Sequence, residues 1–125
     1  DPVGDILKVT VEKMEALGAK RENICCAMGA AIGFCCFETH SDVPDAIREY
    51  IGDKAAENYI FKKAGTDDKY MVDLRGANKQ RLIQLGLKEE NIDINDECTC
   101  CEHDKYWSHR YTKGKRGSMC SGIMI

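Results

Sequence analysis

The sequence predicts an α+β protein in which helices and short strands form mixed layers. Amphipathic segments with helical spacing alternate along the chain with single apolar runs of strand length, and two further strand-like segments close the chain. No glycine-rich phosphate-binding motif follows any of these strands, so the pattern does not support a nucleotide-binding fold. The 125 residues suffice for one domain or for half of a larger one.

The first predicted element is an amphipathic helix over residues 3–17. Apolar residues recur there at spacings of three and four, which is the pattern of a helix with one buried face. Gly18 provides the left-handed position at which many helices end. The unbroken apolar run over residues 24–28 then predicts a strand that is buried on both faces. The helix is expected to bury Val3, Ile6, Leu7, Thr10, Met14 and Leu17.

A second helix is predicted over residues 42–51. Ser41 is typical of an N-cap, and Gly52 marks the C-terminal end. Residues 54–63 carry a mixed signal that fits either more helix or a strand. The buried face of the second helix is expected to hold Val43, Ile47 and Ile51.

A third helix follows a turn and a strand. Residues 66–69 predict the turn and residues 70–72 predict the strand. Asp73 is expected to cap the helix, which runs to Gly86. The side chains expected to point inward are Leu74, Ala77, Leu82 and Leu85.

Three more strands are predicted toward the end of the chain. Residues 92–94 form the first of them. Residues 106–110 and 118–125 are expected to pair with each other around a turn at Gly114 and Gly117. Single strands between helices, followed by a closing strand pair, are typical of mixed α/β layers.

The charge pattern argues against nucleic-acid and membrane partners. The net charge is −3 at pH 7, and acidic and basic residues are interleaved along the chain. The basic residues Lys113, Lys115 and Arg116 are interpreted as a solvated turn. No apolar run approaches the ~20 residues that a membrane-spanning helix needs.

Cysteine is the most informative residue type in the chain. Six of the eight cysteines stand in adjacent pairs, at 25–26, 35–36 and 100–101. Neighbouring cysteines can bridge each other only through a strained ring, and in apolar surroundings free cysteine behaves as a small hydrophobic residue. We therefore expect free thiols and a cytoplasmic location, while the even count leaves disulfide bonds open.

The segment 98–103, CTCCEH, has the C-x-x-C spacing of half a zinc site. Cys98 and Cys101 supply that spacing, and His103 lies close behind them. Three alternatives remain open, namely buried thiols in a turn, a structural zinc site and a redox pair. A redox pair usually lies at a helix N-terminus, and no helical pattern follows here. The residues that could complete a zinc site, if the fold brings them near, are Cys35, Cys36 and His40.

Residues 35–40, CCFETH, combine a possible nucleophile, acid and base. A thiol and the imidazole of His40 could form a nucleophilic pair if they touch in space. Glu38 is either a general acid, if burial raises its pKa, or a surface carboxylate. The small residues from Gly29 to Gly33 would let the backbone approach a ligand closely.

Two arginines are further candidates for ligand binding. Arg110, beside aromatic residues, could bind phosphate in a bidentate manner or pair with a carboxylate. A histidine such as its neighbour His109 more often packs against other side chains or caps a helix than binds a metal. Arg75 and Asn78 share one face of the third helix, where they could reach a ligand or face solvent.

Five segments occur in an order and spacing that can be compared with a known family: AMGAAIGFCCFE, MVDLRGANKQRLIQLGLKEENI, ECTCC, YWSHR and RGSMCSGIMI. Together they resemble the C-terminal half of the YfiH-like family, whose members are often described as laccase-domain proteins or multi-copper polyphenol oxidoreductases. The resemblance implies that residues 1–125 are one partial domain, the C-terminal portion of an α/β sandwich of roughly 250 residues. The N-terminal half of the same protein would then be a partner. The start at Asp1-Pro2, without Met or a signal-peptide pattern, is also expected of a fragment or a processed chain.

The resemblance implies a purine nucleoside phosphorylase that acts on adenosine or inosine, with an accompanying adenosine deaminase activity. Phosphate would attack the ribose C1′ as the purine leaves, while the protein positions the reactants and neutralises charge. The family's zinc ligands, two His and one Cys, lie before the helix that matches residues 3–17. No metal ligand is therefore expected in this chain, and the chain alone is expected to be inactive.

Two other functions remain open. The oxidase description implies copper, but the chain has only three histidines, His40, His103 and His109, and no His-x-His pair. This half alone is therefore not expected to build a multi-copper site. The other alternative is a non-catalytic module stabilised by zinc on Cys98, Cys101 and His103.

The resemblance also implies a substrate-binding pocket in this half. Cys98, in the family's Cys-Thr pair, and Arg110, in its Ser-x-Arg segment, match the family pattern best. The 35–37 segment would then be a pocket wall and not a nucleophile. The expected substrate-binding residues are Cys36, Phe37, Arg75, Asn78, Cys98 and Arg110, and no catalytic residue is assigned in this chain.

Overall fold

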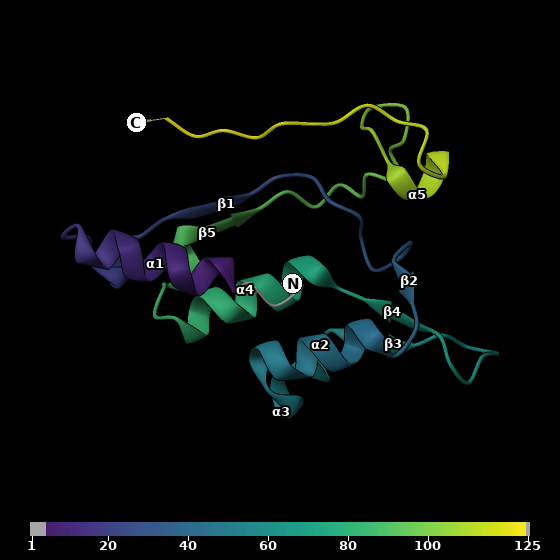
Figure 1. Ribbon diagram of the computed structural model, residues 1–125, viewed down its shortest axis with the longest axis horizontal. Helices are drawn as coiled ribbons and strands as arrows, with labels where there is room; N and C mark the ends of the chain where they lie inside the picture. The colour runs from purple at the N-terminus through teal and green to yellow at the C-terminus, as the bar shows by residue number, and fades with distance from the viewer. Residues whose placement is uncertain (1–4, 125) are drawn as a thin grey trace.

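The computed structural model describes residues 5–124 and arranges them as two small sheets flanked by helices (Figure 1). The predicted α+β class is therefore confirmed. The helices are α1 (Ile6–Ala16), α2 (Asp42–Ile51), α3 (Asp53–Ala56), α4 (Leu74–Gln84) and α5 (His109–Thr112), with short 3-10 turns at η1 (Arg21–Asn23) and η2 (Glu89–Asn91). The strands are β1 (Cys26–Met28), β2 (Glu38–Thr39), β3 (Ile60–Lys62), β4 (Tyr70–Val72) and β5 (Ile92–Ile94).

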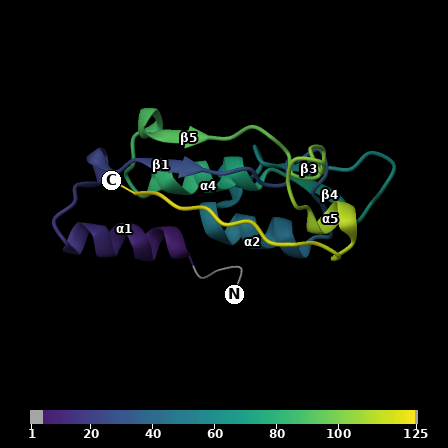
Figure 2. The same ribbon diagram turned by 90° about the horizontal axis from the view of Figure 1, so that it is seen from above.

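The sheets bring distant parts of the chain together. Strands β1 and β5 pair in parallel, with Cys26 opposite Ile92. The other sheet has the antiparallel order β2-β4-β3. An isolated parallel bridge between Ala31 and Cys98 continues the line of the β1–β5 pair. The segment after β1 therefore runs beside the segment after β5, and both lead toward the three-stranded sheet (Figure 2).

Two apolar clusters form the core, and α4 contributes to both. One cluster lies between α1, α4 and the β1–β5 pair, and the other lies between α2, α4 and β4. Complete burial of a valine, leucine or isoleucine side chain contributes about 1.5–3 kcal/mol to stability. The first cluster contains Val11, Ile24, Leu82, Leu85 and Leu87. The second contains Ile47, Ile51, Ala56, Val72 and Ala77.

The first helix is confirmed, but most of its predicted buried face is wrong. Val11 is buried and Leu7 packs partly against the core, whereas Leu17 is 90% exposed. The remaining apolar side chains of α1 do not belong to either core cluster of the described residues. Those exposed against expectation are Ile6, Thr10 and Met14, and Val3 lies outside the described residues. Gly18, with φ of +102°, lies directly beyond the end of the helix as predicted.

Strand β1 is confirmed within the predicted run, but it is not buried on both faces. Cys26 and Met28 are half-buried against the first core cluster, whereas Ala27 on the opposite face is exposed. The described chain places helices on only one side of this sheet (Figure 1). A short apolar run does not show whether a second layer is present.

The second helix has the predicted bounds and the predicted apolar face. Ile47 and Ile51 are buried, and Gly52 ends the helix with φ of +91°. The side chain of Ser41 makes no capping hydrogen bond, although the residue holds the N-cap position. Residues 54–63, whose pattern fitted either a helix or a strand, contain some of each: most of α3 and all of β3 lie within them.

The third helix follows the predicted plan closely. The Asp73 carboxylate accepts a hydrogen bond from the backbone N–H of Gly76 at 3.0 Å, which is the expected cap. A Cβ on Gly76 would lie 2.6 Å from the Tyr59 ring, so this position has no room for a side chain. The helix ends before Gly86, which has φ of +105°. Ala77, Leu82 and Leu85 are buried and Leu74 packs partly against the core, as predicted.

The predicted closing strand pair is wrong. Residues 106–108 form a loop that leads into α5, where Ser108 caps the helix by accepting a hydrogen bond from the Tyr111 N–H at 3.2 Å. Residues 118–124 run back from α5 as an extended segment (Figure 1), and Ile125 lies outside the described residues. No backbone–backbone hydrogen bond of the described chain involves residues 118–124, and a strand exists only with a partner.

Within residues 5–124, no helix combines the length and the apolar character needed to cross a membrane.

Candidate functional site

Four cysteine side chains converge where the segment after β1 meets the segment after β5. The Sγ atoms of Cys35, Cys36, Cys98 and Cys101 all lie within 4.8 Å of one another. The Cys101 Sγ lies 3.6 Å from the Cys35 Sγ and 3.5 Å from the Cys36 Sγ. All four are free thiols, and we call this group the cysteine cluster.

A tight turn explains how two adjacent cysteines point to the same place. The backbone N–H groups of Cys36 and Phe37 both donate to the carbonyl oxygen of Gly33, at 3.1 and 3.0 Å. In an extended strand, neighbouring side chains would point to opposite faces. The turn instead directs both thiols toward Cys101, so residues 33–37 form the first wall of the cluster.

Cys98 is the most buried member of the cluster and differs electrostatically from the others. Burial raises the pKa of its thiol, but the backbone N–H groups of Cys101, Gly33 and Cys100 stabilise the thiolate and lower the pKa to about 6. The Gly33 N–H donates to the Cys98 Sγ at 3.2 Å. By contrast, burial raises the pKa of the Cys35 and Cys36 thiols above their ordinary range. The surroundings therefore favour the thiolate form of Cys98 and the protonated form of Cys35 and Cys36.

Arg75, in α4, stabilises the backbone beside the cysteine cluster. Its guanidinium donates to the backbone carbonyl oxygens of Asn95 and Glu97, the latter at 2.9 Å. A Cβ on Gly33 would lie 3.2 Å from the Arg75 Nη2 and 3.3 Å from both the Cys35 Sγ and the Cys98 Cβ. The expected close approach at this glycine is thus an approach to other parts of the same chain.

A small pocket of about 240 Å³ adjoins the cluster, because Phe37 and Thr99, which follow Cys36 and Cys98 in the chain, line it. The Arg110 guanidinium stands 5.6 Å above the Phe37 ring and donates to the Glu38 carbonyl oxygen at 3.0 Å. The indole ring of Trp107 is half-exposed and contributes to the wall. The remaining lining residues are Ile32, Thr99, Ser108 and His109. This pocket therefore offers aromatic surfaces, a cation and hydroxyl groups.

Glu38 is a surface carboxylate and not a general acid. Lys63 Nζ lies 2.5 Å and Lys69 Nζ 3.0 Å from its carboxylate oxygens. Hydrogen bonds from Lys63 and then Lys69 lower its pKa from the ordinary value of 4.5 to about 2. The carboxylate is consequently ionised at neutral pH and has no proton to donate, so the alternative of a pKa raised by burial is wrong.

Each of the three histidines contacts a different side chain. His40 Nδ1 lies 3.8 Å from an oxygen of Asp68, and the His103 ring stacks on Tyr111 with centroids 3.5 Å apart. His109 accepts a hydrogen bond from Arg116 at 3.3 Å. Among the described residues, the group of His, Cys, Asp and Glu side chains close enough to hold a metal ion is the cysteine cluster, and it contains no histidine. Neither the Cys–His nucleophile nor the set with His103 is assembled as the sequence suggested.

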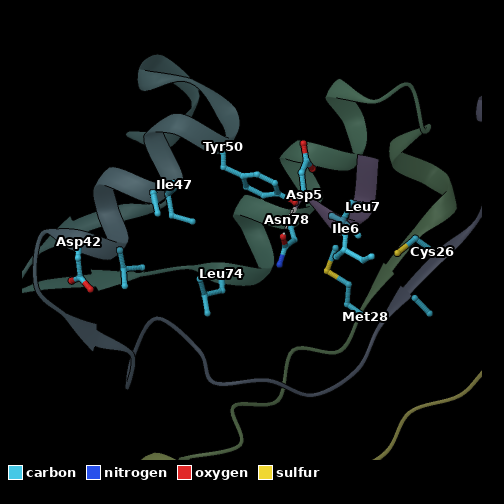
Figure 3. Close-up of a pocket in the computed structure, with 13 residues that line it drawn as sticks. Asp5, Ile6, Leu7, Cys26, Met28, Asp42, Ile47, Tyr50, Leu74 and Asn78 are labelled. Carbon is cyan, nitrogen blue, oxygen red and sulfur yellow. Dashed lines mark hydrogen bonds between the residues drawn. The ribbon is translucent and has the colours of Figure 1, made fainter. Parts of the chain in front are cut away.

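A larger groove of about 690 Å³ lies between α1, α2, α4 and β1 (Figure 3). Its walls are mostly apolar, with Ile47 from α2 facing Met28 from β1 across it. Tyr50 points from α2 toward α4 and donates a hydrogen bond to the Asn78 side chain at 3.2 Å. Burial is the main cause that raises the pKa of Tyr50 to about 12, so the phenol stays protonated.

The structure divides the six expected substrate-binding residues among three places. Cys36 and Cys98 belong to the cysteine cluster, with Arg75 beside it. Phe37 and Arg110 line the small pocket together. Asn78 lines the large groove.

Sequence reasoning missed Trp107, Ser108 and Thr99 as pocket residues. The segment YWSHR carried a signal for two of them, because it places an aromatic residue and a hydroxyl directly before Arg110. No motif in the sequence marked Thr99. It lines the pocket because the turn between Cys98 and Cys101 places it there. The same reasoning did not anticipate that Lys63 and Lys69 would pair with Glu38.

Comparison with known proteins matches almost the whole chain to one family. A family model described as "Multi-copper polyphenol oxidoreductase laccase" matches residues 2–125. The chain is 33% identical over 124 residues to "Adenosine deaminase RL5" from an unknown prokaryotic organism, covering 97% of this chain and 45% of that protein. It is 32% identical over 117 residues to "Purine nucleoside phosphorylase YfiH" of Shigella flexneri, covering 94% of this chain and 45% of that protein.

The fold agrees with a solved structure of the same group. The crystal structure of YlmD from Geobacillus stearothermophilus superposes with a TM-score of 0.82 at 26% identity, over 93% of this chain and 42% of that one. The chain therefore spans less than half the length of the curated relatives it matches. The resemblance that the five sequence segments carry is confirmed.

Proposed function

Because this chain belongs to the family described as multi-copper polyphenol oxidoreductase laccase, we propose that it forms part of a purine nucleoside phosphorylase. The small pocket behind Phe37 is the observation that carries this proposal. Phe37 and Trp107 offer surfaces on which a purine can stack, and Arg110 offers the charge that phosphate requires. The name of the Shigella flexneri relative describes the same activity.

The chemistry needs little from the protein beyond positioning and charge. An oxygen of phosphate attacks the ribose C1′ while the bond to the purine nitrogen breaks, and the purine leaves with the bonding electrons. Arg110 is exposed, and its Nη1 donates to the Glu38 carbonyl oxygen, which fixes the guanidinium at the mouth of the pocket. A fixed cation of this kind lowers the energy of a phosphate that approaches the sugar.

We also propose that a second part of the protein completes the domain. Strands β1 and β5 form a parallel sheet of two strands, and no third strand joins it among residues 5–124. Parallel sheets are almost always larger and covered on both faces. The apolar groove of about 690 Å³ lies open beside this sheet. The N-terminal half of the same protein, which the relatives' greater length suggests, would supply further strands and cover the groove.

That other half would also supply the zinc ligands, two His and one Cys, with which an accompanying adenosine deamination would activate water. The chain alone would then be inactive. We place the reaction in the cytoplasm, because eight free thiols persist best in a reducing compartment.

Copper oxidase chemistry fits the residues of this chain poorly. A laccase-type centre needs several histidines at one place, and the three histidines here have separate partners at Asp68, Tyr111 and Arg116. The donor atoms that do converge are all thiols, which suit zinc or Cu(I) better than Cu(II).

The proposal is tested on the full-length protein with adenosine or inosine, with and without phosphate, by chromatography of the released base. We expect phosphate-dependent release, and we expect Arg110→Ala to lower kcat/KM for phosphate about 10- to 100-fold, because a hydrogen bond to a charged group contributes about 1.5–3 kcal/mol. Arg48→Ala is the matched control, since Arg48 pairs with Asp45 on the outside of α2. Base release without phosphate, or oxidation of a phenol with copper instead, would contradict the proposal.

A further inference from the structure

We propose that Cys35, Cys36, Cys98 and Cys101 form a tetrahedral four-thiolate site for one Zn²⁺ ion. The first argument is the spacing of the sulfur atoms. A zinc ion with Zn–S bonds of ~2.3 Å at the centre of a tetrahedron keeps its sulfur ligands about 3.8 Å apart. Cys101 lies 3.6 and 3.5 Å from two of the other sulfurs, and all four lie within 4.8 Å. The four sulfurs are therefore close enough to one another to bind a single ion.

The second argument is the way in which the backbone holds the ligands. Cys98 and Cys101 are separated by two residues, in a turn that is closed by a hydrogen bond from the Glu102 N–H to the Cys98 carbonyl oxygen at 2.9 Å. The Gly33 N–H, from the opposite segment, donates to the Cys98 sulfur at 3.2 Å. Donors of this kind orient a ligating thiolate and spread its charge. On the opposite side, the 33–37 turn presents Cys35 and Cys36 together.

The third argument concerns access and charge. Cys35 and Cys101 are exposed and Cys36 is half-buried, so an ion can enter from solvent, while Cys98 anchors the site from inside. Four thiolates around Zn²⁺ leave a net charge of about −2. The guanidinium of Arg75 lies beside Gly33, at the edge of the cluster, where it offsets part of this charge.

A disulfide or a redox pair explains the arrangement less well. Such a pair needs two sulfurs, whereas here two adjacent cysteines are turned toward the same partner and a fourth sulfur lies within the same group. The zinc-binding alternative with His103 is replaced by this all-sulfur set, because the His103 ring is stacked on Tyr111. Tetrahedral sulfur sites of this composition are typical of zinc or iron.

The ion would have a structural role next to the proposed pocket. Phe37 follows Cys36 directly, and Thr99 follows Cys98, so two walls of the small pocket are attached to ligands of the ion. Zinc would join the segment after β1 to the segment after β5 at this point. Cys36 and Cys98 would then act through the ion and not by contacting the substrate.

Zinc content of the intact, full-length protein tests the proposal. We expect Cys101→Ser to contain one equivalent of zinc less than the wild type, because Cys101 contacts both members of the adjacent pair. Cys25→Ser is the matched control, since Cys25 is exposed and lies outside the cluster, and it should keep the wild-type amount. Zinc held elsewhere in the protein cancels in this comparison. Equal zinc in all three proteins would overturn the proposal, as would iron in place of zinc.

A second measurement needs no variant. Alkylation of the wild type, followed by mass spectrometry, should label the exposed Cys25 and Cys120 at once. The exposed Cys35 and Cys101 should be protected until a strong chelator is added, although their solvent exposure alone would permit labelling. Immediate labelling of these two thiols without the chelator would overturn the proposal, and so would a disulfide between cluster cysteines in the untreated protein.

Discussion

Two identical dipeptides, Cys25-Cys26 and Cys35-Cys36, differ in backbone conformation and in the directions of their side chains. The first pair stands where β1 begins, so its side chains point to opposite sides, with Cys25 exposed and Cys26 packed against the first core cluster. The second pair stands in the tight turn that starts at Gly33, and both of its thiols point toward Cys101. The comparison teaches that backbone conformation decides whether adjacent cysteines can serve one site. An extended pair separates its thiols, and a turn unites them.

The largest expected effect comes from altering the turn that unites the second pair. In Gly33→Val, a Cβ would lie within 3.3 Å of Arg75, Cys35 and Cys98 atoms, and the two further methyl groups would require the turn to open. Overpacking of this kind destabilises by about 1–3 kcal/mol. Urea-induced unfolding measures the loss, and the same sample should contain less zinc.

The control for this prediction is Gly122→Val, because nothing lies within 4 Å of a Cβ at that position. It should unfold within about 0.5 kcal/mol of the wild type. If Gly33→Val behaved like Gly122→Val in stability and in zinc content, the turn could not be what distinguishes the two cysteine pairs.

A smaller effect is expected within the first pair. Cys26→Ser places a hydroxyl against the apolar cluster of Val11 and Ile24, and its burial without a partner should cost about 1 kcal/mol. Cys25→Ser changes an exposed side chain and should cost less than about 0.5 kcal/mol. Unfolding in urea compares the two variants side by side, and equal costs would show that the first pair does not divide between core and solvent.

The smallest effect concerns Glu38, which anchors the segment that carries the second pair. Its pKa is lowered to about 2 in the folded protein by Lys63 and then Lys69, so the folded state holds its proton less tightly than the unfolded state, where the pKa is near 4.5. The stabilisation by Glu38 is therefore present above pH 4.5 and is lost as the pH falls toward 2.

Urea unfolding of the wild type and of Glu38→Gln between pH 3 and 7 measures this effect. We expect the difference in the free energy of unfolding to be largest near neutral pH and to shrink as the solution becomes acidic. A difference that stays constant over this range would mean that the lysines do not act on the ionised carboxylate.

Local signals in the sequence were sufficient for the three longer helices, α1, α2 and α4, and for several strands. Helix α2 ends where Gly52 permits it, and α4 begins at the Asp73 cap because that carboxylate satisfies a free N–H group. The wrong predictions share one cause. The buried face of α1 and the pairing of residues 118–125 depended on neighbours that the local pattern does not specify.

The site could be predicted only in parts. Trp107 and Arg110 lie in the short segment 106–110, and Phe37 lies in the segment 35–37. The family resemblance pointed to both of these segments. The convergence of Cys36 with Cys101 joins residues 65 positions apart, and no spacing rule predicts such a contact. Asn78 follows Arg75 by three positions, which predicts the same helix face. It nevertheless lines the large groove, because α4 passes between the two core clusters.

The sequence by itself determined the α+β class, the bounds of α2 and α4, and the family, because these depend on caps, periodicity and ordered motifs within short stretches of chain. Only the tertiary structure decided which cysteines meet, which carboxylate stays ionised and which apolar face remains uncovered. The physical reason is that burial, pKa and metal-ligand geometry arise from side chains brought together through space, and those distances are set when β1 pairs with β5.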